Sequence, residues 1–230
     1  MESTITYDTL ELFKSKPSIA VLMSGTGSNA RSILENPEVR EQYDVRIIAT
    51  DNSNSNAQPL AHEFDLDLLE QPVERFVNQS ERDDYFKTLS HKFGDAGIQG
   101  LFYAGFMKIS TQSFSRAFPG VNVHPADLTI LGENGLPVYR GMDALPYMAK
   151  DLGYVKATVH VIDTPVDCGA SLAVSEALFP LAGETYTDLH ERLKVLENTL
   201  YPATLSAIAK GELTAQNLPL LKKQNGGTYA

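Results

Sequence analysis

A short apolar segment of this chain ends in two side chains that can do carbonyl chemistry. The segment is Val121-Asn122-Val123-His124-Pro125, and its apolar residues predict a strand. Because alternate strand residues point to the same face, Asn122 and His124 can face one reacting atom. An amide donates to a developing oxyanion and an imidazole moves a proton, so the pair indicates attack on a carbonyl carbon. An isolated histidine is more often structural, but Asn122 two positions earlier favours catalysis.

A third candidate, Asp167, lies in the loop 163–169 behind a predicted strand over 157–162. A carboxylate near an imidazole favours its charged form and orients the ring. Ligands of open α/β sheets bind beyond the carboxyl ends of the strands, where this loop could meet Asn122 and His124. Taken alone, Asp167 is better explained as a solvated turn residue, so its role depends on that convergence.

A glycine-rich loop, Ser24-Gly25-Thr26-Gly27-Ser28-Asn29, follows an apolar segment over 19–23. Glycines let the backbone approach a ligand, and the start of a helix offers unpaired N–H groups to an anion. Ser, Thr and Asn add side-chain donors that a plain turn does not need. The loop therefore predicts a phosphate site, with a ligand-free turn as the alternative. It also fits the dinucleotide pattern G-x-G-x-x-A, in which Asp51 would hold a ribose.

Apolar segments alternate with helical ones over the first two thirds of the chain, as is typical of a parallel sheet with right-handed crossovers. Strands are predicted over 19–23, 45–49, 66–69, 98–103 and 121–124, and helices over 30–35 and 81–93. The last third predicts a hairpin, 157–162 with 171–177, and a long helix over 187–210. We therefore expect an α/β fold: a doubly wound, mostly parallel sheet with a C-terminal hairpin and a long helix.

The length of 230 residues suits one domain with short additions at its ends. We expect an N-terminal leader over 1–17, a single domain over 18–212 and a C-terminal tail over 213–230. The last residues of that tail, 224–230, are rich in small and polar residues and are expected to be disordered.

The composition narrows the class of protein. A net charge of −10 argues against a large nucleic-acid footprint. The single cysteine, Cys168, cannot form an intrachain disulfide, which fits a reducing compartment. We find no signal peptide, and no apolar run approaches the ~20 residues that span a bilayer. We expect a cytoplasmic enzyme of small molecules, a monomer or homodimer, that binds neither nucleic acid nor membranes.

With these motifs in order, residues 18–210 resemble the folate-dependent formyltransferases. The resemblance rests on the glycine loop and on five further segments: Ala104-Gly105-Phe106-Met107-Lys108-Ile109, Asn122-Val123-His124-Pro125, Thr158-Val159-His160-Val161, Asp163-Thr164-Pro165-Val166-Asp167-Cys168-Gly169, and Glu197 followed by Tyr201-Pro202. It implies a Rossmann-like formyltransferase fold. The implied co-substrate is 10-formyltetrahydrofolate, without a metal, and the implied acceptor is the amine of glycinamide ribonucleotide in purine synthesis.

The resemblance also implies a role for each candidate residue. Asn122, His124 and Asp167 would form the catalytic trio. The acceptor's phosphate and ribose would be bound by Gly25, Thr26, Gly27, Ser28, Asn29 and Glu197. The folate would be bound by Phe106, Met107, Lys108, Ile109 and Asp163. Arg82 would meet the folate's glutamate tail, with a plain surface arginine as the alternative.

Two departures from the family pattern leave the acceptor open. Residues 129–135 look inserted, and the following Leu136-Pro137-Val138-Tyr139-Arg140-Gly141 resembles the methionyl-tRNA and sugar-amine formyltransferases. Lys108 stands where arginine is common, and lysine lacks the same planar fork of donors. These departures leave two alternatives: a formyltransferase for another amine such as an amino-sugar nucleotide, and a silent folate or nucleotide binding module. A third alternative, an NAD-binding oxidoreductase, rests on the pattern of Gly25, Gly27 and Asp51.

Overall fold

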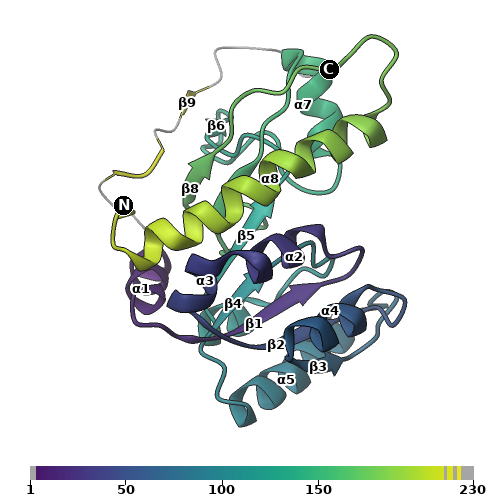
Figure 1. The fold of residues 1–230 in the computed structure, drawn as a ribbon. Coiled ribbons are helices and arrows are strands. Elements are labelled where there is room, and N and C mark those ends of the chain that lie inside the picture. The colour runs from purple at the N-terminus through teal and green to yellow at the C-terminus, as the bar shows by residue number, and fades with distance from the viewer. Residues whose placement is uncertain (1–3, 215–216, 220–221, 224–230) are drawn as a thin grey trace.

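A seven-stranded sheet organises the computed structural model, which describes residues 4–214, 217–219 and 222–223 (Figure 1). The strand order is β3-β2-β1-β4-β5-β7-β8. Five strands are parallel: β1 (Ser18–Met23), β2 (Asp44–Thr50), β3 (Asp67–Glu70), β4 (Gly100–Tyr103) and β5 (Gly120–His124). The hairpin of β7 (Thr158–Val161) and β8 (Ser171–Val174) continues the sheet with antiparallel pairing. The predicted mostly parallel sheet with a C-terminal hairpin is confirmed.

Two layers of helices cover the two faces of this sheet. The larger core lies under α1 (Thr4–Phe13), α2 (Ser28–Glu35), α3 (Pro37–Gln42), α4 (Ala57–Phe64) and the long α8 (Tyr186–Ala209). The second core lies under α5 (Gln79–Asp95) and α6 (Gln112–Ala117), on the other face. The central strand β1 is buried over its whole length because side chains of both cores enclose it, which explains its continuous apolar sequence.

The alternation of strand residues divides β5 and β7 between these two environments. Their valines lie in the larger core: Val121, Val123, Val159 and Val161. Asn122 pairs with Tyr103 of β4, whose ring belongs to the second core, and also with His160 of β7. The sheet face that α5 and α6 cover at β1 and β4 continues over β5 and β7. There it carries polar side chains, namely Asn122, His124 and His160.

The long helix α8 begins with a capping box in which Thr185 and Asp188 bond reciprocally. Its predicted apolar face is buried, with Leu189 and Leu193 in the larger core. The Tyr201 hydroxyl donates to the Val121 carbonyl at 2.5 Å, so α8 is tied directly to the backbone of β5. This contact places one face of α8 beside β5. Glu197, Lys194 and His190 lie on α8 one to three turns before Tyr201.

Additional elements occupy the ends of the chain and the region after β5. Phe13 of α1 stacks edge-on against Tyr43 and Phe102, so α1 contributes to the larger core. Short β6 (Ile130–Leu131) pairs in parallel with β9 (Lys222–Lys223), and α7 (Ala144–Leu152) follows. The division into 1–17, 18–212 and 213–230 stays a prediction, and residues 224–230 lie outside the described residues. Among the helices described, none is long and apolar enough to cross a membrane.

Candidate active site

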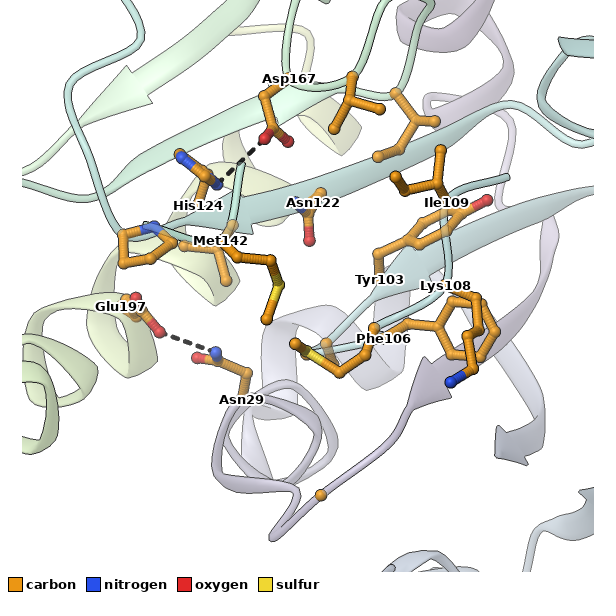
Figure 2. Close-up of a pocket in the computed structure, with 18 of the residues that line it drawn as sticks. Asn29, Tyr103, Phe106, Lys108, Ile109, Asn122, His124, Met142, Asp167 and Glu197 are labelled. Atoms are coloured by element: carbon orange, nitrogen blue, oxygen red, sulfur yellow. Dashed lines mark hydrogen bonds and ion pairs between the residues drawn. The ribbon is translucent and has the colours of Figure 1, made fainter. Parts of the chain in front are cut away.

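Nearly all predicted site residues line one cavity of about 530 Å³ (Figure 2). Its walls come from the loops behind β1 and β4, from the end of β5, from the loop behind β7 and from α8. The predicted residues that line it are Gly25, Thr26, Gly27, Ser28, Asn29, Phe106, Met107, Lys108, Ile109, Asn122, His124, Asp163, Asp167 and Glu197. The structure therefore brings together residues that are up to about 170 positions apart in the sequence.

His124 is held by its backbone surroundings in one orientation. Its Nε2 lies 3.1 Å from the Tyr139 carbonyl, and because a carbonyl only accepts, Nε2 carries a proton and donates it. Its Nδ1 lies 3.5 Å from Asp167 Oδ2 (Figure 2). Burial lowers the pKa of His124 below its ordinary value, although the Asp167 carboxylate and the Tyr139 carbonyl oppose this effect. The ring is therefore neutral at pH 7, with the Nδ1 lone pair on the side of Asp167.

Asp167 reaches His124 because the loop behind β7 folds back along β5. Ile162 donates to the Gly120 carbonyl at the start of β5, at 2.8 Å, whereas Asp167 contacts His124 at its end. The Gly141 N–H donates to Asp167 Oδ2 at 2.9 Å and fixes the carboxylate. Asp167 also has a φ of 57°, which is uncommon for a residue other than glycine and is often found at functional sites.

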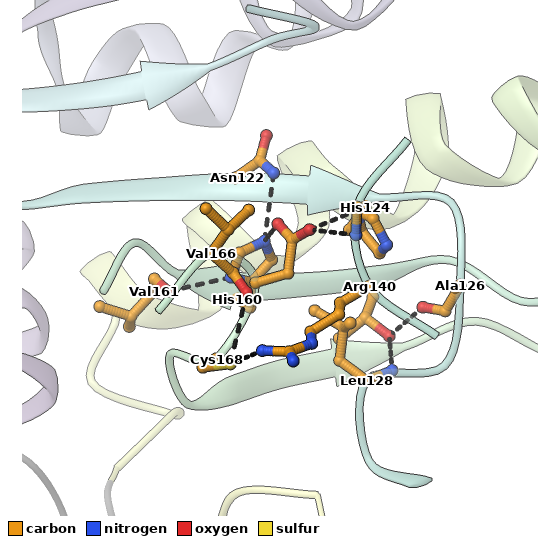
Figure 3. Close-up of polar contacts among 12 residues, drawn as sticks. Asn122, His124, Ala126, Leu128, Arg140, His160, Val161, Val166 and Cys168 are labelled. Atoms are coloured by element: carbon orange, nitrogen blue, oxygen red, sulfur yellow. Dashed lines mark hydrogen bonds and ion pairs between the residues drawn. The ribbon is translucent and has the colours of Figure 1, made fainter. Parts of the chain in front are cut away.

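Asn122 contacts a buried histidine that the sequence reasoning did not single out. His160 Nδ1 donates to the Val161 carbonyl at 2.9 Å, so its Nε2 accepts from Asn122 Nδ2 at 3.1 Å (Figure 3). The contact sets the amide with its N–H groups on the His160 side. His160 Nε2 also lies 3.6 Å from Asp167 Oδ1. The sequence analysis included His160 in the segment Thr158-Val159-His160-Val161 that carries the family resemblance, but it gave the residue no role, because strand alternation alone does not show that His160 faces Asn122.

The stability of the protein should fall in acid because of His160. Burial lowers its pKa to about 4, while an unfolded histidine has a pKa of about 6.5. Between these values the unfolded chain binds more protons, so the free energy of unfolding decreases as the pH falls through this window, by on the order of 3 kcal/mol. Urea unfolding at pH 7 and pH 4.5 measures the change. His160→Gln should reduce it, whereas substitution of the exposed His91 by Gln should not; equal pH dependence in all three proteins would refute the assignment.

The segment after the predicted insertion contacts both catalytic candidates through its backbone. Tyr139 accepts from His124, and Gly141 donates to Asp167. Between them, Arg140 Nη1 lies 3.6 Å from Cys168 Sγ, next to Asp167 in the chain (Figure 3). The Tyr139 side chain is buried in a third core cluster with Ile130 and Met148, which anchors the segment. Residues 139–141 therefore connect the two candidates, a function that the sequence analysis did not assign to them.

At the opposite end of the cavity, the glycine loop starts α2. Gly27 has a φ of 77° and is the N-cap of this helix. Asn29, in the first turn, donates from Nδ2 to Glu197 Oε2 at 2.9 Å. Burial raises the pKa of Glu197, and the hydrogen bond from Asn29 opposes this effect. His190 and Lys194 of α8 also line this end, and neither was predicted from the sequence. The backbone donors and an ammonium group at this end suit an anion.

Gly27→Ala should destabilise the protein by about 1–3 kcal/mol. A Cβ at Gly27 would lie 2.6 Å from Leu60 Cδ1 and 2.8 Å from Met23 Cε, and the positive φ disfavours any side chain. Gly25→Ala is the matched control, because a Cβ there meets nothing within 4 Å and the φ of Gly25 is not in the left-handed region. Urea unfolding compares the two variants. Equal stabilities would contradict the requirement for glycine at position 27.

The middle of the cavity is apolar and open to solvent. Met107, Ile109, Met142 and Val166 line it, with between 37% and 76% of each residue exposed. The Phe106 ring stacks edge-on against Tyr103 at 6.1 Å, and the Tyr103 hydroxyl bonds Ser110 at 2.7 Å. Large apolar side chains left exposed around a cavity are typical of a surface that a ligand covers. A flat heteroaromatic ring fits such a surface.

Two predicted ligand residues have side chains engaged elsewhere. The Lys108 ammonium lies 3.2 Å from Asp51 Oδ2 and donates to the Glu74 carbonyl at 2.8 Å. Arg82 does not line the main cavity but an adjoining depression that shares residues 107–109 with it. Its Nη2 lies 3.4 Å from the Ser110 carbonyl.

Within residues 4–214, 217–219 and 222–223, no group of three or more His, Cys, Asp or Glu side chains is arranged to hold a metal ion.

An amide, an imidazole and a carboxylate lie together near the end of β5, across one cavity from the glycine loop, and this arrangement suits an enzyme that acts on a carbonyl group. Residues 17–205 match the family described as formyl transferase. The chain belongs to this family.

Individual relatives agree with this assignment. The phosphoribosylglycinamide formyltransferase of Mycobacterium tuberculosis is 32% identical over 200 residues, covering 85% of this chain and 86% of that protein. The human trifunctional purine biosynthetic protein adenosine-3 is 26% identical over 86% of this chain and 19% of its own length. A glycinamide ribonucleotide transformylase from Symbiobacterium toebii has a similar fold, with a TM-score of 0.74 at 24% identity over 90% of this chain and 94% of that one.

Proposed function

We propose that this protein transfers the formyl group of 10-formyltetrahydrofolate to the amine of glycinamide ribonucleotide in purine synthesis. The observation that carries the proposal is the convergence of Asn122, His124 and Asp167 in a cavity whose other end is the glycine loop. The name of the Mycobacterium tuberculosis relative, which matches over most of both chains, supports this acceptor.

The acceptor would occupy the end of the cavity at α2 and α8. Its phosphate would bind the residues of the glycine loop, Gly25, Thr26, Gly27, Ser28 and Asn29. Lys194 is a nearby cation, although its ammonium lies 2.6 Å from Glu191 Oε1. Glu197, oriented by the amide of Asn29, would accept hydrogen bonds from the ribose hydroxyls. This placement points the amine of the acceptor along the cavity toward His124.

The donor would occupy the apolar middle of the cavity. Its pterin would lie among Phe106, Met107 and Ile109, with backbone groups of this segment and of the loop at Asp163 as hydrogen-bonding partners. Lys108 would contribute through its backbone and its alkyl chain, because its ammonium is paired with Asp51. The glutamate tail would leave the cavity over residues 107–109 toward Arg82, in the adjoining depression.

The chemistry then follows from the positions of three side chains. The neutral amine attacks the formyl carbon, and the carbonyl oxygen becomes an oxyanion that the second N–H of Asn122 stabilises. His124 Nδ1 takes the proton that the attacking nitrogen must lose, and Asp167 stabilises the resulting imidazolium. The proton passes to the nitrogen of the leaving folate as the carbon–nitrogen bond breaks. The formylated acceptor and tetrahydrofolate are released, and His124 returns to its neutral form.

One observation disfavours the dinucleotide alternative. Asp51, which would hold the ribose of NAD, is 3% exposed and has both carboxylate oxygens engaged by Ser24 and Lys108.

The alternative acceptor, an amino-sugar nucleotide, keeps the same donor and the same trio. We further propose a cytoplasmic monomer or homodimer without membrane partners. We also propose that it has no nucleic-acid partner, because a net charge of −10 disfavours binding to a polyanion.

An acceptor screen with 10-formyltetrahydrofolate tests the proposal. Purified protein should release tetrahydrofolate with glycinamide ribonucleotide and not with an amino-sugar nucleotide or with NAD-linked substrates. Release with the amino-sugar nucleotide alone would keep the reaction and replace the acceptor. No release with any amine would leave the proposed function without support, and binding of both ligands without turnover would favour a silent module.

A further inference from the structure

Asp51 directly follows β2 and is almost completely buried, although the proposed reaction gives it no function. Its Oδ1 accepts a hydrogen bond from the Ser24 hydroxyl. Its Oδ2 lies 3.2 Å from the Lys108 ammonium. Each carboxylate oxygen is thus engaged by another side chain of the protein, which distinguishes Asp51 from a residue that waits for a ligand.

The two partners of Asp51 belong to the two segments that the proposed function assigns to different substrates. Ser24 begins the loop assigned to the acceptor's phosphate, and Lys108 lies in the segment assigned to the folate. The Ser24 hydroxyl also accepts from the Met107 N–H at 2.9 Å. The Ser24 N–H donates to the Gly105 carbonyl at 3.1 Å. Asp51 is therefore the charged centre of a network that joins the two segments.

Burial strengthens the charged contact at the centre of this network. The side chain of Asp51 is 2% exposed and that of Lys108 is 16% exposed, so their attraction is screened far less than that of a surface pair. Removal of either charge leaves the other uncompensated in a dry environment, which is costlier than the loss of a surface ion pair. The Asn52 side chain donates a further hydrogen bond to the Ser24 carbonyl, at 2.9 Å, and so also contacts the start of the glycine loop.

We propose that Asp51 is a positioning residue that couples the two substrate sites, so that acceptor and donor bind cooperatively. A ligand that orders the glycine loop also orders Ser24, and through Asp51 and the Met107 N–H it orders the segment 105–108. The second ligand then has less conformational entropy to remove, and linkage makes the effect reciprocal. This inference rests on the proposed function, because that function assigns the glycine loop and the segment 105–108 to two different substrates.

Calorimetric titration measures the coupling without turnover, since tetrahydrofolate and glycinamide ribonucleotide cannot react with each other. In the unaltered protein, saturating glycinamide ribonucleotide should lower the Kd of tetrahydrofolate about fivefold or more. In Asp51→Asn the change should be less than about twofold, because the amide keeps an acceptor for Ser24 but loses the attraction to Lys108. Lys108→Met should lose the coupling as well, and Lys108→Arg should keep it.

A double variant and a remote control complete the test. Asp51→Asn combined with Lys108→Met should lose no more coupling than either change alone, since both remove the same pair. Lys210→Met, which breaks an exposed ion pair with Glu38, should keep the coupling of the unaltered protein. Circular dichroism checks that each variant is folded. If Asp51→Asn does not fold, the Lys108 variants still decide the question.

Two outcomes would overturn the inference while leaving the proposed function intact. One is an active protein in which the two ligands bind independently. The other is full coupling in Asp51→Asn or Lys108→Met, with only a lower melting temperature, which would reduce the pair to a structural role. Failure of the unaltered protein to bind glycinamide ribonucleotide or to turn over would instead remove the proposed function, and the two failures are thereby distinguished.

Discussion

His124→Ala should lower kcat by about 10² to 10⁴, the range for removal of a group that transfers a proton in the transition state. The tetrahedral adduct carries a proton on the attacking nitrogen that must leave before the folate can depart. His124 Nδ1 is the basic atom for this transfer, because Nε2 is committed to the Tyr139 carbonyl. Steady-state release of tetrahydrofolate measures kcat.

Two controls separate lost chemistry from lost structure in this variant. Circular dichroism and urea unfolding should show a folded protein, although the buried Tyr139 carbonyl loses a donor, at a cost of about 1–3 kcal/mol. Substitution of the exposed His91 by Ala should leave kcat unchanged. A near-normal rate for His124→Ala would reject the histidine as a member of the trio.

Asp167→Asn should lower kcat/KM by a similar factor of about 10² to 10⁴, through loss of the charge that stabilises the imidazolium. The amide oxygen can still accept from the Gly141 N–H, so the loop keeps its anchor. The pH dependence of kcat/KM should also shift in this variant, because the Asp167 carboxylate raises the pKa of His124 against the effect of burial. Without this carboxylate the pKa of His124 falls further, and the acid limb of kcat/KM moves to lower pH while the plateau drops.

The pH profile distinguishes two roles for His124. If the neutral ring accepts the proton, kcat/KM falls as the pH drops through a pKa below the ordinary value of about 6.5. If the imidazolium instead supports the oxyanion, kcat/KM falls as the pH rises through that pKa. NMR titration of His124 in the unaltered protein and in Asp167→Asn assigns the limb to this residue. An acid limb that does not move in Asp167→Asn would contradict the contact between the two side chains.

Sequence reasoning succeeded where local pattern carries the information. The apolar run over residues 19–23 predicted β1, because a strand enclosed by two cores needs apolar side chains throughout. The run over 45–49 predicted β2, whose buried part begins at Ile47, whereas Arg46 is exposed. The spacing of Leu189 and Leu193 predicted the buried face of α8. The residue types in 24–29 and 122–124 were enough to propose an anion site and carbonyl chemistry, since each kind of chemistry requires particular donors and acceptors.

Other features depend on which strands become neighbours. The antiparallel register of β5 and β7 places His160 opposite Asn122, and a shift of one residue would have pointed it into the valine core. Asp51 looked like a ribose ligand, but its carboxylate is enclosed by Ser24 and Lys108, which lie 27 and 57 residues away in the chain. No local periodicity records such long-range pairings.

By itself, the amino-acid sequence determined the class of fold, the chemical groups and the order in which they follow one another. Only the tertiary structure decided that the loop behind β7 folds back along β5 to bring Asp167 to His124, and that Tyr139 and Gly141 hold the pair from the other side. The physical reason is that side-chain chemistry and periodicity are properties of short segments, whereas the path of a loop depends on the packing of the whole sheet against its helices.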